Sequence, residues 1–250
     1  MTGYLYSNQM AMFGEREVIG FGSADFMVAV IDRDLANSIV AERHYSKRFV
    51  RSSRIHLGVS IDGELVGVLQ FGVAMNPASM GGILQDCGLY EYLELNRMWL
   101  DDKAPRNSES RAISYAIKYI RKAEPKILFI QSFGDERCGL NGTVYQAANF
   151  LYCGEHLGKF WELDGEFYHD SILTDSKKMD TPRGRHLRAN AARAVLHRLR
   201  QFRYIYLMQP RFRSRLLLAV KPYPKQIATR PADEPVPAGA SLVQPEGVAP

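Results

Sequence analysis

The dipeptide Asp62-Gly63 separates two apolar segments, Ile55 to Ile61 and Glu64 to Val73. Asp-Gly readily adopts the positive φ angles of a two-residue turn, so the two segments are expected to form adjacent antiparallel strands. Folds in which every strand alternates with a helix do not contain such a hairpin. The sequence therefore argues against a doubly wound parallel fold.

Further apolar runs on both sides of this hairpin predict the other elements. Strands are expected at residues 26–31, 93–100, 127–133 and 151–154, with a last strand or hairpin around residues 164–165. Helices are expected at residues 34–45 with Asp34 as N-cap, directly after residues 105–110, and at residues 143–149. Residues 1–24 carry little pattern, and residues 74–92 read as a long loop. This order predicts an α+β fold with a mixed, mostly antiparallel sheet flanked by helices.

Positive charge is concentrated in the C-terminal third of the chain. Residues 177–225 contain fourteen Lys and Arg residues and one acidic residue, Asp180, whereas the rest of the chain carries a net charge of −8. Such segregation is typical of a protein that binds nucleic acid. A solvated cationic face or a patch for anionic membranes would produce the same pattern.

Within this basic segment, residues 185–206 have the spacing of an amphipathic helix. Its cationic arc carries Arg185, Arg188, Arg193, Arg200 and Arg203. The chain after residue 221 holds seven of the twelve prolines and few apolar residues, which predicts disorder. We therefore expect a globular body over residues 1–176, a basic helical extension over residues 177–221, and a Pro-rich disordered tail over residues 222–250.

The composition of the 250 residues, 46% hydrophobic and 24% charged, indicates a soluble globular protein. No run approaches the roughly 18 uncharged apolar residues of a membrane span, and the first residues lack the pattern of a secretory signal. Cys87, Cys138 and Cys153 are too few and too scattered for a disulfide framework, and no CxxC pair suggests zinc. We expect reduced thiols, no membrane association and a location in the cytoplasm.

The start of the helix after residues 105–110 is a first candidate site. Helix N-termini offer unpaired N–H groups to phosphates, and Arg106, Asn107 and Ser108 stand at this start. The segment could bind a phosphate of a nucleotide or of acyl-CoA, or it could be a plain capping motif. The segment lacks the glycine spacing of a phosphate-binding loop.

A second candidate lies at the end of the first helix. His44 suits a general base or a metal ligand, and Tyr45 suits stacking on a nucleic-acid base, although a lone histidine is often structural. A small basic cluster that could contact a phosphate backbone follows directly: Lys47, Arg48, Arg51 and Arg54.

The strand at residues 93–100 carries unusual polar residues. By alternation Glu94 and Asn96 share one face, and Arg97 lies on the other. An arginine inside an apolar strand is costly unless it meets an anion or a carboxylate. Arg97 could bind an anionic ligand or form a buried pair with an acid such as Asp135.

Asp135 and Tyr145 flank one loop between a buried strand and a helix. Asp135 could act as a general base, bind a metal, or cap the turn, while Tyr145 could act as a general acid or stack. Four histidines could join Asp135 in an iron or zinc site, but no HxH or HExxH spacing supports one: His44, His56, His156 and His169. The sequence does not decide whether the protein binds a metal ion.

Four segments together resemble the Mom family of Mu-like phages. They are Glu42-Arg43-His44-Tyr45-Ser46, Leu95-Asn96-Arg97-Met98-Trp99, Ser132-Phe133-Gly134-Asp135 and Gly142-Thr143-Val144-Tyr145-Gln146-Ala147-Ala148-Asn149-Phe150. The resemblance spans about residues 25–210, and several motifs in the right order are far more specific than any one of them.

This resemblance implies a GNAT-like acyltransferase domain in residues 1–176. It also implies an activity, the conversion of adenine in double-stranded DNA to N6-carbamoylmethyladenine, which protects phage DNA from host restriction. It suggests an acyl-CoA-type pocket and an iron ion that His44 and Asp135 could bind. The positions that match the family's functional motifs are His44, Arg97, Asp135 and Tyr145.

GNAT proteins bind the CoA pyrophosphate where this chain has residues 107–114, which include Ser110 and Ser114. The segment departs from the usual GNAT pattern because it has no glycine, so the donor could be acetyl-CoA or another acyl or glycyl compound. In this hypothesis, Arg97 stabilises negative charge or holds an anionic donor, and Asp135 or His44 takes a proton from a flipped adenine.

Two other functions remain as alternatives. They are a conventional N-acetyltransferase for a protein or small amine and a non-catalytic DNA-binding protein. The oligomeric state stays open.

Overall fold

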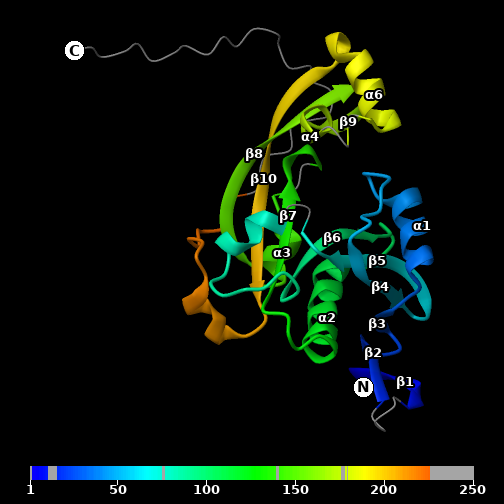
Figure 1. Ribbon diagram of the computed structural model, residues 1–250. Helices are drawn as coiled ribbons and strands as arrows, with labels where there is room; N and C mark the ends of the chain where they lie inside the picture. Colours follow the sequence, from blue (N-terminus) through cyan, green and yellow to red (C-terminus); the bar gives the residue numbers. More distant parts are fainter. Residues whose placement is uncertain are drawn as a thin grey trace.

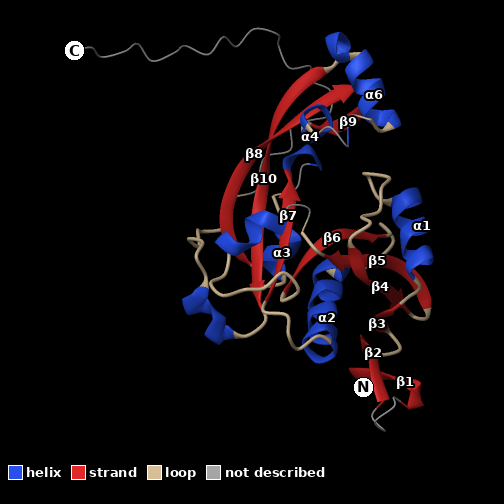
Figure 2. Ribbon diagram, in the orientation of Figure 1, coloured by secondary structure: helices blue, strands red, loops and turns tan. Residues whose placement is uncertain are grey.

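A single sheet contains every strand of the described chain in the computed structural model (Figures 1 and 2). The structure describes residues 2–10, 16–74, 77–138, 141–175, 178 and 180–225. The strands are β1 (Gly3–Met10), β2 (Arg16–Gly22), β3 (Phe26–Val30), β4 (Ser53–Ile61), β5 (Glu64–Gly72), β6 (Tyr92–Leu100), β7 (Phe129–Asp135), β8 (Leu151–Leu163), β9 (Glu166–His169) and β10 (Val195–Leu207). Their order in the sheet is β1-β2-β3-β4-β5-β6-β7-β10-β8-β9.

The sheet is mixed and mostly antiparallel, as predicted. Among the described strands, β6 and β7 form the one parallel pair, and all other neighbours are antiparallel. The predicted hairpin joins β4 to β5, with Asp62 at φ 50° and Gly63 at φ 85°. The expected α+β class is therefore confirmed.

Two helices cover opposite faces of the first half of the sheet. The helices of the described chain are α1 (Arg33–Arg43), α2 (Ser108–Ala123), α3 (Thr143–Ala147), α4 (Ser171–Thr174) and α6 (Pro182–Ala189). Val68 packs with Ala36 and Val40 of α1, whereas Leu69 belongs to the main core together with the buried stripe of α2. Because consecutive strand residues face opposite sides, α1 and α2 lie on different faces.

The first helix begins earlier than predicted. Its N-cap is Asp32 and not Asp34, because the Asp32 carboxylate accepts hydrogen bonds from the backbone N–H groups of Asp34 and Leu35. The helix ends at Arg43, and His44 adopts an extended backbone. The residues of the second candidate site therefore lie on the loop that leaves the helix.

The helix predicted over residues 185–206 is wrong. Helix α6 ends at Ala189, a short 3-10 turn follows (Ala191–Arg193), and residues 195–207 form strand β10. This strand lies between β7 and β8, and its residues Phe202, Tyr204 and Ile205 are fully buried. The basic segment is thus part of the sheet, and it supplies the strand that joins β7 to the long strand β8 (Figure 1).

Other differences from the predictions lie near the ends of the chain and in the loop over residues 74–92. Strands β1 and β2 occupy the weakly patterned residues, and the loop contains a 3-10 turn (Pro77–Gly82) and a bridge from Leu84 to Leu216. Most of the tail predicted to be disordered, residues 226–250, lies outside the described residues.

All three cysteines are free, as predicted. Among the helices that the structure describes, none has the length and apolar character needed to cross a membrane.

Candidate active site

Strands β6 and β7 separate after a short paired segment. Their parallel register covers Tyr92–Glu94 against Phe129–Gln131 and then ends, so Arg97 and Asp135 lie on diverging strand segments (Figure 1). A buried polar network stands where the strands part: Gln131 Nε2 donates to Glu94 Oε2 over 2.9 Å, and Asn96 Nδ2 donates to Glu94 Oε1 over 3.3 Å. The opening where these two strands part is thus bordered by polar side chains from both strands.

His44 lies buried beside this opening. The backbone N–H of Ser46 donates to His44 Nδ1 over 3.1 Å. Burial, together with the nearby charges of Arg97 and Arg137, lowers the pKa of His44 to about 4. The imidazole is therefore neutral at pH 7, with its remaining proton on Nε2.

Asp135 ends strand β7 and is held by Arg137. The carboxylate accepts the backbone N–H of Arg137 at 3.0 Å and its guanidinium Nη2 at 2.9 Å. The turn-capping interpretation of Asp135 is thus realised in the structure. Its carboxylate also lies near Tyr45, and capping leaves a carboxylate lone pair that can accept a further proton.

The guanidinium of Arg137 is surrounded by aromatic rings. It lies 5.2 Å from the centroids of Tyr45 and Phe160 and 5.6 Å from that of Phe167. Tyr45 is 55% exposed, and its ring lies 4.2 Å from that of His44. The site therefore offers an accessible aromatic surface next to a carboxylate.

Arg97 does not pair with Asp135. Its Nε donates to the carbonyl oxygen of Arg48 over 2.7 Å, and its Nη1 donates to the carbonyl oxygen of Asn96 over 2.6 Å. These bonds connect β6 to the loop after α1 and place a positive charge close to His44. The charge of Arg97 therefore lies near His44 and Tyr45, with the Glu94 carboxylate also nearby.

Tyr145 lies at the base of the opening, apart from the Asp135 group. Its ring contacts Phe150 and Tyr204, at centroid distances of 5.6 and 5.4 Å, and its hydroxyl lies near Ser132. Burial raises the pKa of Tyr145, so the hydroxyl stays protonated at neutral pH. The structure thus brings His44, Arg97 and Asp135 together and places Tyr145 beside Glu94.

In this arrangement the residues present do not fit an iron site. His44 and Asp135 lie among the guanidinium groups of Arg97 and Arg137, and Asp135 is already bound by one of them. Within the described residues, no three His, Cys, Asp or Glu side chains gather as metal ligands.

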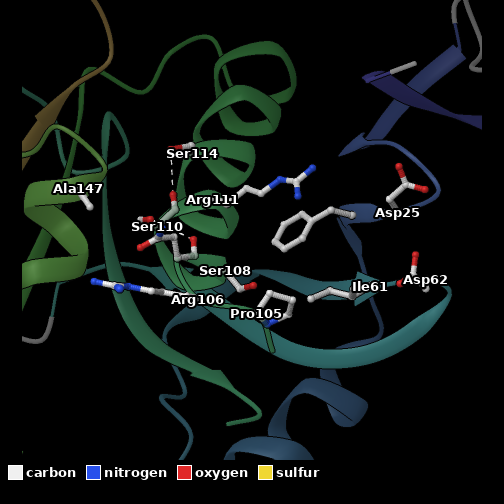
Figure 3. A pocket seen from close by; sticks show the side chains of 12 residues that line it. Asp25, Ile61, Asp62, Pro105, Arg106, Ser108, Ser110, Arg111, Ser114 and Ala147 are labelled. Atoms are coloured by element: carbon white, nitrogen blue, oxygen red, sulfur yellow. Dashed lines mark hydrogen bonds between the residues drawn. The ribbon is translucent and has the colours of Figure 1, made fainter. Parts of the chain in front are cut away.

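The start of helix α2 borders a cavity of about 480 Å³ (Figure 3). All five residues predicted to bind a cofactor line it: Arg106, Asn107, Ser108, Ser110 and Ser114. Asn107 is the N-cap at φ 70°, and its side chain makes no capping hydrogen bond, which leaves the first helical turn without a side-chain cap. This combination of a helix start, a guanidinium and hydroxyl groups is suited to an anion.

The cavity has two unlike ends. Figure 3 shows Arg106 pointing toward Ala147 of α3, whereas Asp25 and Asp62 stand at the opposite end. Arg111 lies between them, with its guanidinium 4.2 Å from the Phe26 ring centroid. An anion would therefore bind near Arg106, and the acidic end would repel it.

The arginines predicted to contact DNA fall into two groups. Four of them are bound to acidic side chains: Arg48 with Glu166 at 3.9 Å, Arg54 with Glu124 at 3.8 Å, Arg193 with Asp164 at 2.5 Å, and Arg200 with Glu136 at 2.6 Å. The Arg54 pair joins β4 to the end of α2, away from the loop after α1.

The other predicted contacts have no acidic partner among the described residues. The side chains of Lys47 and Arg185 donate to the backbone carbonyls of Glu42 and Asp180. Arg51 takes part through its backbone carbonyl, which accepts a hydrogen bond from the Arg33 side chain. The Arg203 guanidinium lies over the Phe133 ring. Arg188 is exposed on α6. These cations remain available to a phosphate backbone.

Sequence reasoning missed three residues that the structure places at this site: Arg137, Phe160 and Gln201. Arg137 had a signal, since it follows Asp135 by two residues. Phe160 and Gln201 had none, because their position depends on the pairing of β8 and β10 with β7.

Comparison with known proteins places these features in a family context. The sequence model of the Mom protein family matches residues 25–225. The methylcarbamoylase Mom of Escherichia phage Mu is 50% identical over 214 residues, which cover 84% of this chain and 88% of that protein.

Solved acetyltransferase structures are also similar to the chain. A ribosomal-protein-S5-alanine acetyltransferase from Vibrio fischeri matches with a TM-score of 0.46 and 11% identity, covering 77% of this chain and 98% of that chain. Arabidopsis thaliana NAA60 in complex with acetyl-CoA matches with a TM-score of 0.46 and 9% identity, covering 73% and 99%.

Proposed function

The chain belongs to the Mom family, and from this we propose that it is a phage enzyme that modifies adenine in double-stranded DNA. The product is N6-carbamoylmethyladenine, and the modification protects phage DNA from restriction in the host cytoplasm. One structural observation carries the proposal: His44, Arg97 and Asp135 come from distant parts of the chain and gather beside an exposed tyrosine where two strands diverge.

Asp135 is the proposed general base. N6 of adenine must lose a proton as it forms a bond to carbon, and a carboxylate within reach can accept that proton. Arg137 holds the carboxylate in place through two hydrogen bonds. His44, which is neutral and carries its proton on Nε2, acts as a hydrogen-bond donor in this scheme, and Arg97 stabilises developing negative charge.

The target base must leave the duplex to reach this site, because its N6 amine is paired inside the helix. Tyr45 provides the exposed ring on which the extruded base stacks. Lys47, Arg185, Arg188 and Arg203 are proposed to contact phosphates. The bound arginines Arg48, Arg54, Arg193 and Arg200 contribute less to DNA binding, since their charges are compensated.

The donor is proposed to bind at the start of α2, with its anionic part near Arg106 and Ser108. A CoA-type pyrophosphate fits this end of the cavity. The transferred group must be attached to N6 through its methylene carbon, whereas ordinary acetyl transfer joins nitrogen to a carbonyl carbon. The proposed donor, an acyl or glycyl compound other than acetyl-CoA, therefore carries a leaving group on the methylene carbon of a carbamoylmethyl unit. N6 forms its bond to that carbon as the bond to the leaving group breaks, the N6 proton passes to Asp135, and the leaving group departs as an anion or takes a proton from Tyr145.

Mass spectrometry of nucleosides tests this function. DNA from cells that express the protein should contain adenosine heavier by one carbamoylmethyl group. A well-expressed protein that leaves adenosine unmodified but acetylates a protein or a small amine would indicate a conventional N-acetyltransferase. A protein that binds DNA tightly and transfers nothing would be a non-catalytic DNA-binding protein.

A further inference from the structure

Asp135, Gln201 and His156 form a row across three neighbouring strands. The register pairs Gln201 of β10 with Asp135 of β7 on one side and with His156 of β8 on the other. Residues directly opposite each other in antiparallel strands have their side chains on the same face of the sheet. Gln201 and His156 therefore face the same side as the proposed general base.

This row is continuous with the aromatic cluster around Arg137. A Cβ at Gly158 would lie 2.7 Å from Cε2 of Phe160 and 3.7 Å from Cδ of Gln201. The absence of a side chain at Gly158 thus lets the Phe160 ring lie close to the Gln201 amide. Because Arg137 lies over that ring, the amide, the carboxylate and the guanidinium border one region.

The row is accessible to a ligand. Gln201 is half-buried and His156 is exposed, with its ring 5.7 Å from that of Phe133. The Gln201 amide also hydrogen-bonds to the His156 imidazole, and its oxygen has two lone pairs, so an acceptor remains for a ligand. An amide in this position offers one acceptor and two donors, whereas the neighbouring Asp135 carboxylate only accepts. Adenine presents the complementary pattern on each of its polar edges, an N6 amine that donates next to a ring nitrogen that accepts.

We propose that Gln201 recognises the target adenine, its Oε1 accepting from one N6–H while its Nε2 donates to the adjacent ring nitrogen. This inference rests on the proposed function, since the second N6–H is then directed to Asp135. Gln201 rejects guanine and thymine, because each presents a carbonyl acceptor where adenine has its N6 amine. Cytosine also has an amine next to a ring nitrogen on its pairing edge, so the amide excludes cytosine when it contacts N7 of adenine, an atom that cytosine lacks. His156 borders the base from the next strand.

Binding to altered adenines tests this role without a donor. Purified protein is titrated with duplexes in which one adenine stands opposite an abasic site, so that extrusion is easy. The central base is adenine, 7-deazaadenine or 1-deazaadenine. Wild-type protein should bind one deaza duplex roughly tenfold more weakly than the adenine duplex, because one deletion removes the ring nitrogen that Gln201 contacts.

Two substitutions test the two hydrogen bonds of the amide. Gln201→Leu removes both hydrogen bonds and Gln201→Glu removes only the donor to the ring nitrogen, so each variant should bind the three duplexes with equal affinity. Gln201→Glu should bind them more tightly than Gln201→Leu, because it keeps the acceptor for N6–H. Gln209→Leu is the matched control, because Gln209 follows the far end of β10 and should leave the discrimination unchanged. Thermal unfolding of each variant checks that the sheet is intact.

The same variants in expressing cells separate this inference from the proposed function. Gln201→Leu should lower the modified adenine about tenfold, while Gln209→Leu should not. If wild-type protein modifies adenine and Gln201→Leu does so equally, or if it retains the deaza discrimination, the role of Gln201 is refuted and the function stands. If wild-type protein leaves adenine unmodified, the function itself is refuted.

Discussion

The backbone N–H of Ser46 donates to Nδ1 of His44 over 3.1 Å, and the Ser46 hydroxyl lies 2.8 Å from the same nitrogen. These contacts engage the lone pair with which a neutral imidazole accepts a proton. His44 is held in the tautomer that donates from Nε2, which leaves Asp135 as the base of the site.

The first prediction concerns the pH dependence of stability. The folded protein binds a proton at His44 only near pH 4, because burial lowers its pKa to about 4, whereas the unfolded chain binds one near the ordinary value of 6.5. Neutral His44 therefore contributes its full stabilisation to the fold above pH 6.5. The free energy of unfolding should fall by about 3 kcal/mol as the pH decreases from there toward 4. Urea unfolding at neutral and acidic pH should show a smaller acid loss for His44→Gln than for wild type. Equal losses would show that His44 is not held neutral.

The second prediction concerns Asp135. Asp135→Asn keeps the size of the side chain and an oxygen for the Arg137 N–H, but it removes the proton acceptor. We expect at least about a 100-fold loss of adenine modification, measured in nucleosides from expressing cells, with DNA affinity retained. Asp101→Asn, which changes a carboxylate on the turn after β6, is the control. Full activity in Asp135→Asn would shift the role of base to another group.

The third prediction concerns the start of α2. Arg106→Gln removes the cation at one end of the cavity and should weaken binding of CoA, used as the probe in calorimetry, about tenfold. Lys103→Gln removes a nearby exposed cation and should have no effect. If the Arg106→Gln variant bound CoA as tightly as wild type, the anionic part of the donor would not bind at this end of the cavity.

The fourth prediction separates structural from DNA-binding arginines. Arg200 donates to Glu136 through Nε at 3.0 Å and Nη2 at 2.6 Å, and its backbone N–H binds the same carboxylate. Arg200→Met should therefore lower the stability by about 1 kcal/mol after solvent screening and leave the salt dependence of DNA binding unchanged. Arg188→Gln should reduce that salt slope by about one and leave stability unchanged. The reverse pattern would assign the DNA contact to Arg200.

The fifth prediction concerns Gly142, which has a φ of 86° and lies against the Tyr204 ring. An added Cβ would overlap the ring, which is fixed because its hydroxyl donates to the Asn141 carbonyl over 2.5 Å. Gly142→Ala should lower the free energy of unfolding by about 2 kcal/mol or more. Gly63→Ala is a useful comparison, since that glycine also has a positive φ but has open space around it. Equal losses in the two variants would leave only backbone strain as the cause.

The sequence predicted the elements whose signals are local. The Asp62-Gly63 turn and the apolar stripe of α2 depend on neighbouring residues, and both were confirmed. Strand β10 was mistaken for a helix because its apolar residues fit both spacings over a long segment. Its content of Val, Phe, Tyr and Ile favours a strand, and its burial between β7 and β8 decides the outcome.

The residues of the candidate site also divide into those with a local sequence signal and those without one. His44, Arg97 and Asp135 stand in recognisable motifs, so they could be named from the sequence and are found close together. Gln201 and Phe160 enter the site through the register of distant strands, which no local pattern encodes. The ion pairs that compensate Arg193 and Arg200 likewise join residues far apart in the sequence.

The place of β10 between β7 and β8 affects the order in which the protein can assemble. Strands β7 and β8 precede β10 in the chain and cannot join until it is made, so the end of the sheet formed by β8 and β9 stays apart from β7 until then. Pairings of such long sequence separation form slowly. The row that contains Asp135 and Gln201 is thus completed only after residues 195–207 have been made, and a nascent chain that lacks them has no finished surface with which to act on DNA.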